Sequence, residues 1–230
     1  MVENTTAELH TNMRSRLTGK YGALEEYVWD KVGKLQGKYI AGSSSAVASL
    51  ARLRRAVSAE PGSDPFVWQE TLEGLPKQFV GDDQTVSLEE RAVHAAMTLF
   101  AVHQQSKIDK MHKPRISFGA AASKLAYATG MEGKQNPAVL RRFQALGTAT
   151  SLTESVTHAR GLIGQFRSAG ISLDYGRLAV DLARLQDSRS ADTVRLEWGR
   201  AYYFKPDARG SEEPEPVNST TTTSPNGDTE

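Results

Sequence analysis

The sequence SLEERAVHAAMTLF (Ser87–Phe100) decides the fold class of this chain. It opens with a capping box, in which a serine at the N-cap position is followed three residues later by a glutamate, and this pair predicts the start of a helix. Leu88, Val93, Met97 and Phe100 then lie on one side of that helix. The stretch therefore predicts a long helix that packs against a core.

Helical signals continue on both sides of this stretch. Between Tyr21 and Ile40, apolar residues recur at intervals of three and four, which is the period of one helical stripe. Capping residues and first-turn prolines predict further helix starts, at Ser44 or Ser45, Asp64-Pro65, Ser117, Asn136-Pro137, Ser151 to Glu154, Asp174 and Ser190. Gly170 fits the residue that follows a helix end. Because no alternating strand pattern occurs, the sequence predicts an all-α fold, a single helical bundle of about eight or nine helices over residues 21–204.

The two ends of the chain differ from this body. Residues 1–20 are polar, and we expect a flexible N-terminal arm there. Residues 205–230 are acidic and rich in proline and threonine, so they cannot bury a core and are expected to form a disordered tail. The sequence has no cysteine, no apolar signal-peptide core and no apolar run long enough to span a bilayer. These absences favour a cytoplasmic protein without a membrane partner.

Positive charge is concentrated in one part of the sequence. The whole chain carries only +1, but residues 102–142 hold eight basic residues against two acidic ones, a net charge of +6. The tail offsets this charge, with two basic residues against six acidic ones. A folded protein that gathers cations in this way usually binds a polyanion. The candidate contacts with nucleic acid are Arg54, Arg55, Lys107, Lys110, Arg115, Lys124, Arg141 and Arg142.

These basic residues fit contacts with phosphates better than contacts with bases. For any one of them, a solvated helix face is an equally good interpretation, but a cluster in loops and at helix ends has no role in packing. Few aromatic residues lie among them, and Phe118 and Phe143 fall on apolar stripes, which predicts core positions. A base-stacking platform is therefore not indicated, and the residues are expected to follow a nucleic-acid backbone.

The sequence contains no constellation typical of an enzyme. Phosphate-binding glycine loops, a serine nucleophile elbow and the zinc motif HExxH are all missing. Glu90 and His94, like Glu154 and His158, are four residues apart, whereas di-iron bundles use Glu-x-x-His with two further glutamates. We interpret these pairs as a capping glutamate and a histidine one turn later, and Asp181 as part of a solvated face. No catalytic residue, metal site or cofactor is predicted.

Several segments together resemble one known family. They are LARLRRAV (Leu50–Val57), ERAVHAAMTLFAVHQQS (Glu90–Ser106), KMH (Lys110–His112), ISFGAAASKLA (Ile116–Ala126), RRFQAL (Arg141–Leu146), LDYGRLAVDLARLQ (Leu173–Gln186) and VRLEWGRAYY (Val194–Tyr203). In order and spacing, over roughly residues 24–204, they resemble CasB, the small subunit of the type I-E CRISPR Cascade complex. No single segment is diagnostic, so the specificity of the resemblance lies in the series.

The resemblance implies an all-helical subunit without enzymatic activity. It implies a head-to-tail pair with a second copy of the chain and contacts with other Cascade subunits. It also implies basic contacts that help hold guide RNA and target DNA and that stabilise the displaced DNA strand of the R-loop in antiviral defence. The positions that match the family's contacts are Arg54, Arg55, Lys107, Lys110, Arg141 and Arg142. The family often has a basic residue after its Ser-x-Gly step, where this chain has Ala120, and Lys124 follows one turn later.

Two other interpretations stay open at this point. A free-standing helical nucleic-acid-binding protein, such as a regulator, would also explain the basic cluster, although no recognition helix beside a tight turn can be placed in the sequence. A scaffold that binds no nucleic acid would leave the charge of residues 102–142 unexplained.

Overall fold

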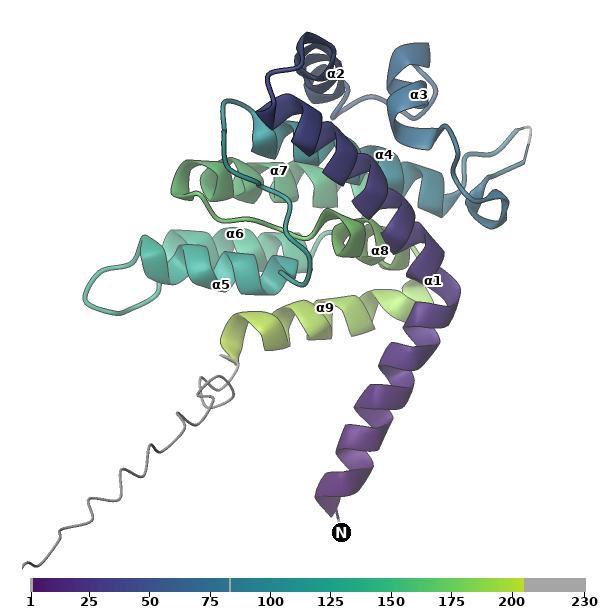
Figure 1. Ribbon diagram of the computed structural model, residues 1–230. Helices are drawn as coiled ribbons and strands as arrows, with labels where there is room; N and C mark the ends of the chain where they lie inside the picture. The colour runs from purple at the N-terminus through teal and green to yellow at the C-terminus, as the bar shows by residue number, and fades with distance from the viewer. Residues whose placement is uncertain (1, 83, 205–230) are drawn as a thin grey trace, which may run out of the picture.

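Helix α4 (Leu88–Gln104) is the central element of the fold (Figure 1). The computed structural model describes residues 2–82 and 84–204. The predicted capping box is present, because the Ser87 hydroxyl accepts a hydrogen bond from Glu90 N and the Glu90 carboxylate accepts one from Ser87 N. Every residue from Ala92 to Ala101 is buried. The helix is therefore covered on all its sides rather than on one stripe.

Helices from both halves of the chain surround α4. They are α1 (Val2–Ile40), α2 (Ser44–Arg55), α3 (Pro65–Leu72), α7 (Leu152–Ala169) and α8 (Tyr175–Leu185). A short 3-10 turn, η1 (Lys77–Phe79), follows α3. Helices α1 and α8 approach closely at Gly176, where a Cβ atom would collide with the Trp29 indole. Only glycine fits at that crossing, so residue 176 fixes how α1 lies on the core.

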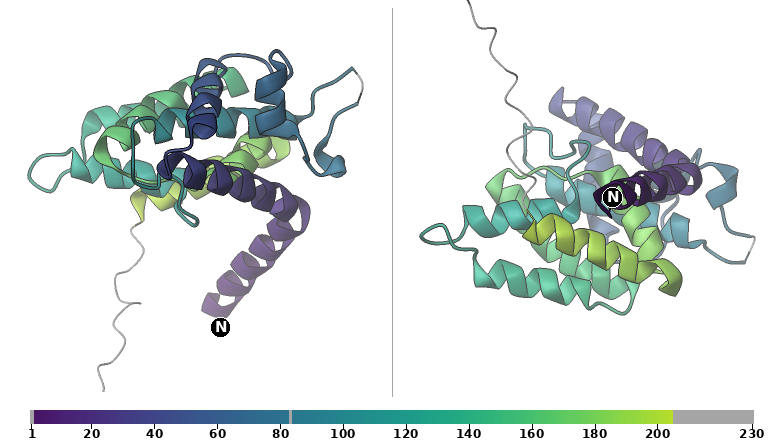
Figure 2. Two further views of the ribbon diagram at one scale, coloured as in Figure 1. Left: turned by 45° about the horizontal axis from the view of Figure 1, so that its top comes forward. Right: turned by 90° about the horizontal axis from the view of Figure 1, so that it is seen from below.

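A second layer consists of α5 (Phe118–Ala128), α6 (Pro137–Gly147) and α9 (Ser188–Tyr203), as Figures 1 and 2 show. Aromatic rings join these helices. The ring centroids of Phe118 and Trp198 are 5.2 Å apart, and those of Phe143 and Tyr202 are 4.5 Å apart. All four rings are buried. The prediction that Phe118 and Phe143 belong to the core is therefore confirmed.

The predicted all-α fold is confirmed. Within the described residues the chain forms nine α-helices, and its only strand-like pairings are two isolated bridges. Most helices begin where a cap was predicted, and in each case the cap side chain accepts a backbone N–H, at Asp64, Ser87, Ser117, Asn136, Ser151 and Asp174. Gly170 ends α7 with a φ of 65°. None of the described helices combines the length and the apolar character that a bilayer crossing needs.

The first helix is longer than predicted. It begins at Val2, whereas the sequence pattern indicated a helix from residue 21 and a loose segment before it. Residues 2–20 contain no proline and a single glycine, so no residue type there stops the helix. The structure therefore gives this segment a helical conformation, and the flexibility of the N-terminal arm stays a prediction. The predicted acidic tail, residues 205–230, lies outside the described residues.

Two predicted caps are displaced. Helix α2 begins at Ser44, so its N-cap is Ser43 rather than Ser44 or Ser45. Helix α9 begins at Ser188, because the Asp187 carboxylate accepts a hydrogen bond from Arg189 N. The Ser190 hydroxyl, predicted as that cap, instead donates to the carbonyl oxygen of Arg184 at 2.7 Å. Asp187 and Ser190 are both good capping residues, and Asp187, which is nearer to the end of α8, is the one that caps α9.

Candidate nucleic-acid interface

A cleft of about 460 Å³ opens between α2, α4 and α7. Four arginines line it, Arg54 and Arg55 from α2 and Arg160 and Arg167 from α7, and we name it the arginine cleft. The rest of its lining is small or neutral, and consists of Ala51, Val102, Gln105 and Gly164. The cleft is therefore an open, strongly basic cavity without an acidic residue in its wall.

The sequence of α7 explains how two arginines face this cleft together. Arg160, Gly164 and Arg167 are four and three residues apart, so they share one face of the helix. Apart from its two chain neighbours and the backbone of α7 itself, no heavy atom lies within 4 Å of the position that a Cβ atom would take at Gly164. A glycine in a helix interior is unfavourable by about 0.5–1 kcal/mol relative to alanine. Here that glycine leaves open the space between the two arginines.

The positive charge of the arginine cleft is not neutralised by carboxylates. Among the described residues, none of its four arginines takes part in an ion pair. Arg167 is oriented by neutral groups, since its Nη1 donates to Gln105 Oε1 at 2.9 Å and to Val102 O at 3.4 Å. Like charges gathered in one cavity repel one another, and an entering anion relieves that repulsion. The arginine cleft thus has the electrostatics of an anion-binding site.

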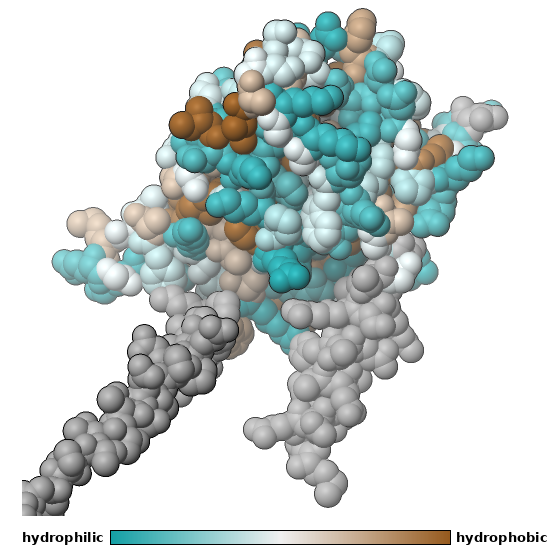
Figure 3. Space-filling view, in the orientation of Figure 1, coloured by the Kyte–Doolittle hydropathy of each residue, from teal (hydrophilic) through white to brown (hydrophobic). Residues whose placement is uncertain are grey.

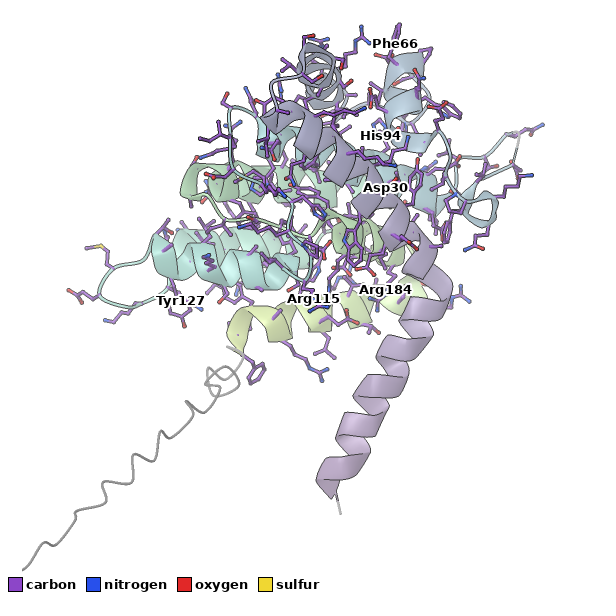
Figure 4. The ribbon with its side chains drawn as sticks, in the orientation of Figure 1. Asp30, Phe66, His94, Arg115, Tyr127 and Arg184 are labelled. Atoms are coloured by element: carbon purple, nitrogen blue, oxygen red, sulfur yellow. The ribbon has the colours of Figure 1, made fainter. Side chains whose placement is uncertain are left out.

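Residues 105–117 connect α4 to α5, and we name this segment the basic loop. It carries Lys107, Lys110, Lys113 and Arg115. Lys107 is partly exposed and the other three are exposed. In Figure 4, Arg115 lies where the loop approaches α5 and α9. The loop therefore presents a row of cations at the surface.

The backbone of the basic loop is held from inside by Gln104, the last residue of α4. Its side chain is fully buried. Its Nε2 donates to the carbonyl oxygens of Lys107 at 2.8 Å and Asp109 at 2.9 Å, and its Oε1 accepts from Met111 N at 3.2 Å. One amide side chain thus satisfies three backbone groups of the loop, which fixes the path of the chain on both sides of its tip.

Two further buried side chains hold the second half of the loop. Gln36 of α1 exchanges two hydrogen bonds with the backbone of His112, at 2.8 Å to its N–H and 3.3 Å to its carbonyl oxygen. Asp174, the cap of α8, accepts from Arg115 N at 2.7 Å and from the Trp29 indole N–H at 2.6 Å. The loop is therefore a rigid segment that is tied to α1, α4 and α8.

Two buried histidines, His103 at the end of α4 and His112 within the basic loop, both contact Tyr175. His112 Nδ1 accepts a hydrogen bond from Tyr175 N at 3.2 Å. His103 Nδ1 lies 2.9 Å from the Tyr175 hydroxyl. Burial lowers the pKa of His112, although the Asp174 carboxylate opposes this effect, and burial lowers the pKa of His103 to about 3. Both rings are therefore neutral parts of the core at neutral pH.

The arginine cleft and the basic loop adjoin each other. Gln105 lines the cleft and is also the first residue of the loop. Burial is the main cause of the lowered pKa of His103, and the positive charges of Arg167 and Lys107 lower it further. Both cations therefore lie close to the same ring. The two features together form one basic surface that runs from α2 and α7 onto the α4–α5 connection.

A family model for the CRISPR-associated protein Cse2 matches residues 49–203. The chain belongs to the Cse2 family. Among solved structures it is similar to the crystal structure of CasB from Thermobifida fusca, with 28% sequence identity and a TM-score of 0.65. That match covers 78% of this chain and 97% of the CasB chain. No curated protein sequence matches the chain. The resemblance to CasB that the sequence indicated is confirmed.

The Cse2 match spans all the predicted contact residues, and the structure distributes them over four places. Arg54 and Arg55 line the arginine cleft. The others lie on the basic loop (Lys107, Lys110, Arg115), on α5 (Lys124) and on α6 (Arg141, Arg142). The residues on α5 and α6 are exposed and do not line the cleft. Their roles as contacts stay predictions.

Sequence reasoning missed two members of the arginine cleft, Arg160 and Arg167. Both lie beyond the window of residues 102–142 in which the local charge density is high. The signal that would have found them is the spacing along α7, where two arginines seven residues apart enclose a glycine on one helix face. They share a cleft with Arg54 and Arg55 only because α2 and α7 both pack against α4, a tertiary arrangement that no local sequence pattern contains.

The two Glu–His pairs have roles in the helix framework. The Glu90 carboxylate accepts two backbone N–H groups in front of α4, and His94 Nε2 lies 3.1 Å from a backbone carbonyl oxygen. Glu154 accepts from Thr150 N rather than from Ser151 N, so the predicted second capping box is only half formed. His158 Nε2 lies 3.7 Å from Glu154. Among the described residues, no three side chains that could ligate a metal gather at one place.

Asp181 is buried, which corrects its interpretation as part of a solvated face. It is 2% exposed, and its Oδ2 accepts from the Trp198 indole N–H at 2.6 Å. Arg184 lies 3.8 Å from its other oxygen. Burial raises the pKa of Asp181 to about 7 despite the arginines nearby. Helix α8 packs against α1, α4 and α9, so it keeps almost no solvated face.

Proposed function

We propose that this protein is the non-catalytic small subunit of a type I-E CRISPR Cascade complex. In this role it holds the backbones of guide RNA and target DNA, and it stabilises the R-loop and its displaced DNA strand in antiviral defence. Its partners are other Cascade subunits and a second copy of itself, joined head to tail. Membership in the Cse2 family supports a place in Cascade.

One observation supports binding of nucleic acid most directly: the arginine cleft and the basic loop adjoin each other and form one basic surface. Guanidinium groups without a carboxylate partner form strong, charge-assisted hydrogen bonds to phosphate. The basic loop is already fixed by buried hydrogen bonds. Little conformational entropy is therefore lost when a strand binds to it. Phosphate contacts carry no sequence information, which suits a subunit that must accept any target.

The free energies of the R-loop explain why contacts of this kind suffice. Opening a DNA duplex against a guide RNA exchanges one duplex for another of similar stability, so modest contacts with the backbone shift the balance. A basic surface that holds the displaced strand lowers the free energy of the open state and slows the return of that strand. Chemistry on the nucleic acid is not needed for this effect.

The test is the salt dependence of binding to single-stranded DNA of mixed sequence, measured with the full-length chain. The logarithm of affinity should fall with the logarithm of salt concentration with a slope of about −0.7 per phosphate contact, or roughly −3 to −4 for four to six contacts. Changing Arg54 and Arg55 to alanine should reduce the slope by about 1.4. The pair Arg141→Ala and Arg142→Ala should act in the same way, equally for all sequences.

Matched controls are exposed cations that already have carboxylate partners. Lys34 pairs with Asp30 at 2.6 Å, and Arg189 pairs with Asp187 at 2.9 Å. Lys34→Ala and Arg189→Ala should leave the slope unchanged. If the Arg54/Arg55 variant had the same salt slope as the unchanged chain, or lost affinity only for some DNA sequences, binding through the DNA backbone would be contradicted.

The place of the protein in a complex is tested separately, by a tagged pull-down from the native host. We expect guide RNA that derives from CRISPR repeats, together with the other subunits. A free-standing helical nucleic-acid-binding protein is the alternative function. Recovery of the protein alone, from cells that express such a complex, would favour that alternative.

A further inference from the structure

The tip of the basic loop carries an unusually exposed apolar side chain. Ile108 is 86% exposed and is preceded by Lys107 and followed by Asp109. Figure 3 shows an apolar patch on this face, in the region where Figure 1 draws the connection from α4 to α5. Ile40, the last residue of α1, is also exposed, at 38%. A single exposed apolar residue needs no explanation by itself, but Ile108 is also held on a fixed backbone and lies among charged residues.

The backbone on both sides of Ile108 is fixed. The carbonyl oxygens of Lys107 and Asp109 both accept hydrogen bonds from the buried amide of Gln104. Before the tip, Ser106 adopts a left-handed conformation with a φ of 57°, and its N–H donates to the Tyr39 hydroxyl at 3.1 Å. Because the chain cannot fold inward at this point, the isoleucine side chain is presented to solvent on a rigid support.

The charges around the tip indicate which part of a nucleic acid can lie on it. Lys107 and Lys110 flank the tip and attract phosphates, whereas the exposed carboxylate of Asp109 at the tip repels them. A bound strand therefore has its phosphates beside the tip and its bases over it. The surrounding cations also make a polyanion a better occupant than an apolar protein surface.

We infer that Ile108 contacts the faces of unstacked bases in the single strand whose backbone the basic loop binds, an inference that rests on the proposed function. Apolar side chains pack against unstacked bases in many nucleic-acid complexes. Every base has an apolar face, so this contact is indifferent to sequence, as the proposed function requires. The basic loop then holds the displaced strand in two ways, through its phosphates and through a base that is kept out of the stack.

The test uses the full-length chain and single-stranded DNA that contains the fluorescent base 2-aminopurine. Ile108→Ser should weaken binding by about three- to tenfold, the effect of returning part of an isoleucine side chain to water. It should also reduce the fluorescence change on binding. The slope of affinity against salt should stay unchanged, because no cation is removed. Ile108→Phe should tighten binding by a similar factor, since an aromatic ring stacks on a base.

Met131→Ser is the matched control, because Met131 is 80% exposed on the connection between α5 and α6, beside Glu132. It should leave binding unchanged. If Ile108→Ser binds DNA like the unchanged chain but is lost from the assembled complex in a pull-down, Ile108 docks a protein subunit and the inference is overturned. The absence of any salt-dependent binding, in every variant, would instead contradict the proposed function itself.

Discussion

At the scale of single residues, the interface depends on buried polar groups as much as on exposed cations. Gln36, Gln104 and Asp174 are buried, and each is hydrogen-bonded to the backbone of the basic loop. A buried backbone group that loses its partner costs about 1–3 kcal/mol. These side chains are thus positioning residues, since they decide where the cations of the loop lie.

His103 gives a prediction about acid stability. Its pKa is about 3 in the folded chain because it is buried, against an ordinary value of 6.5. Below pH 6.5 the unfolded chain therefore binds a proton that the folded chain does not bind, so stability falls as the pH falls from 6.5 toward 3. At pH 5 the loss from this residue is about 2 kcal/mol. Urea unfolding at pH 7 and at pH 5 measures it.

The variant that isolates this effect is His103→Gln, which cannot titrate. It should be less stable at pH 7, because the contact with Tyr175 is altered, but it should lose less stability between pH 7 and pH 5. Burial also lowers the pKa values of His94 and His112, so part of the pH dependence stays. His158→Gln, at a partly exposed position on α7, is the control. An unchanged pH dependence in His103→Gln would refute the assignment.

At the scale of elements, α7 has a glycine in its interior, Gly164, at the position that lines the arginine cleft. Gly164→Leu should stabilise the helix by about 0.5–1 kcal/mol while it fills the arginine cleft. Binding of single-stranded DNA should therefore weaken although the protein becomes more stable. Gly161→Leu is the matched control, since residue 161 is exposed and has open space around its Cβ position. It should stabilise the helix without affecting binding. Equal binding by both variants would show that the cleft is not used.

The basic loop gives a second prediction at this scale. Gln36→Leu keeps every cation of the loop but removes both hydrogen bonds to His112. We expect faster amide hydrogen exchange in residues 105–117 and a loss of stability of about 2–4 kcal/mol. Affinity for single-stranded DNA should fall, because the loop must now be ordered when the strand binds. Gln144→Leu, at an exposed position on α6, should leave the hydrogen exchange of the loop, the stability and the affinity unchanged.

The elements also show what the sequence could and could not predict. Caps at Asp64, Ser87 and Asn136 were predictable because a helix start is decided by side chains within three residues. The burial of Asp181 and the approach of Arg160 to Arg54 were not, because both depend on which helices pack against α8 and α7. The candidate site was therefore predictable where its charges are dense in sequence, and it was missed where the fold brings distant arginines together.

At the scale of the whole molecule, the arginine cleft and the basic loop lie on elements that the core fixes relative to one another. Helix α4 forms one wall of the cleft, carries Gln104 at its end and continues directly into the loop. A strand that binds both features thus lies against the central helix of the fold. Because α2 and α7 both pack against α4, the arginines of the cleft and the cations of the loop are positioned relative to the same helix.

The balance of charge over the whole chain gives the last prediction. Residues 205–230 carry six acidic residues against two basic ones, whereas residues 1–204 carry a net charge of +5. We expect the tail to compete with nucleic acid for the basic surface, so its deletion should tighten binding of non-specific single-stranded DNA by about threefold or more at low salt. A full-length variant with Glu212→Gln, Glu213→Gln and Glu215→Gln should show the same direction, because it keeps the length and removes charge. If deletion tightens binding but the glutamine variant does not, the tail acts by its bulk. If neither variant changes the affinity, competition by the tail is disproved, and the near-neutral total charge has no role in binding.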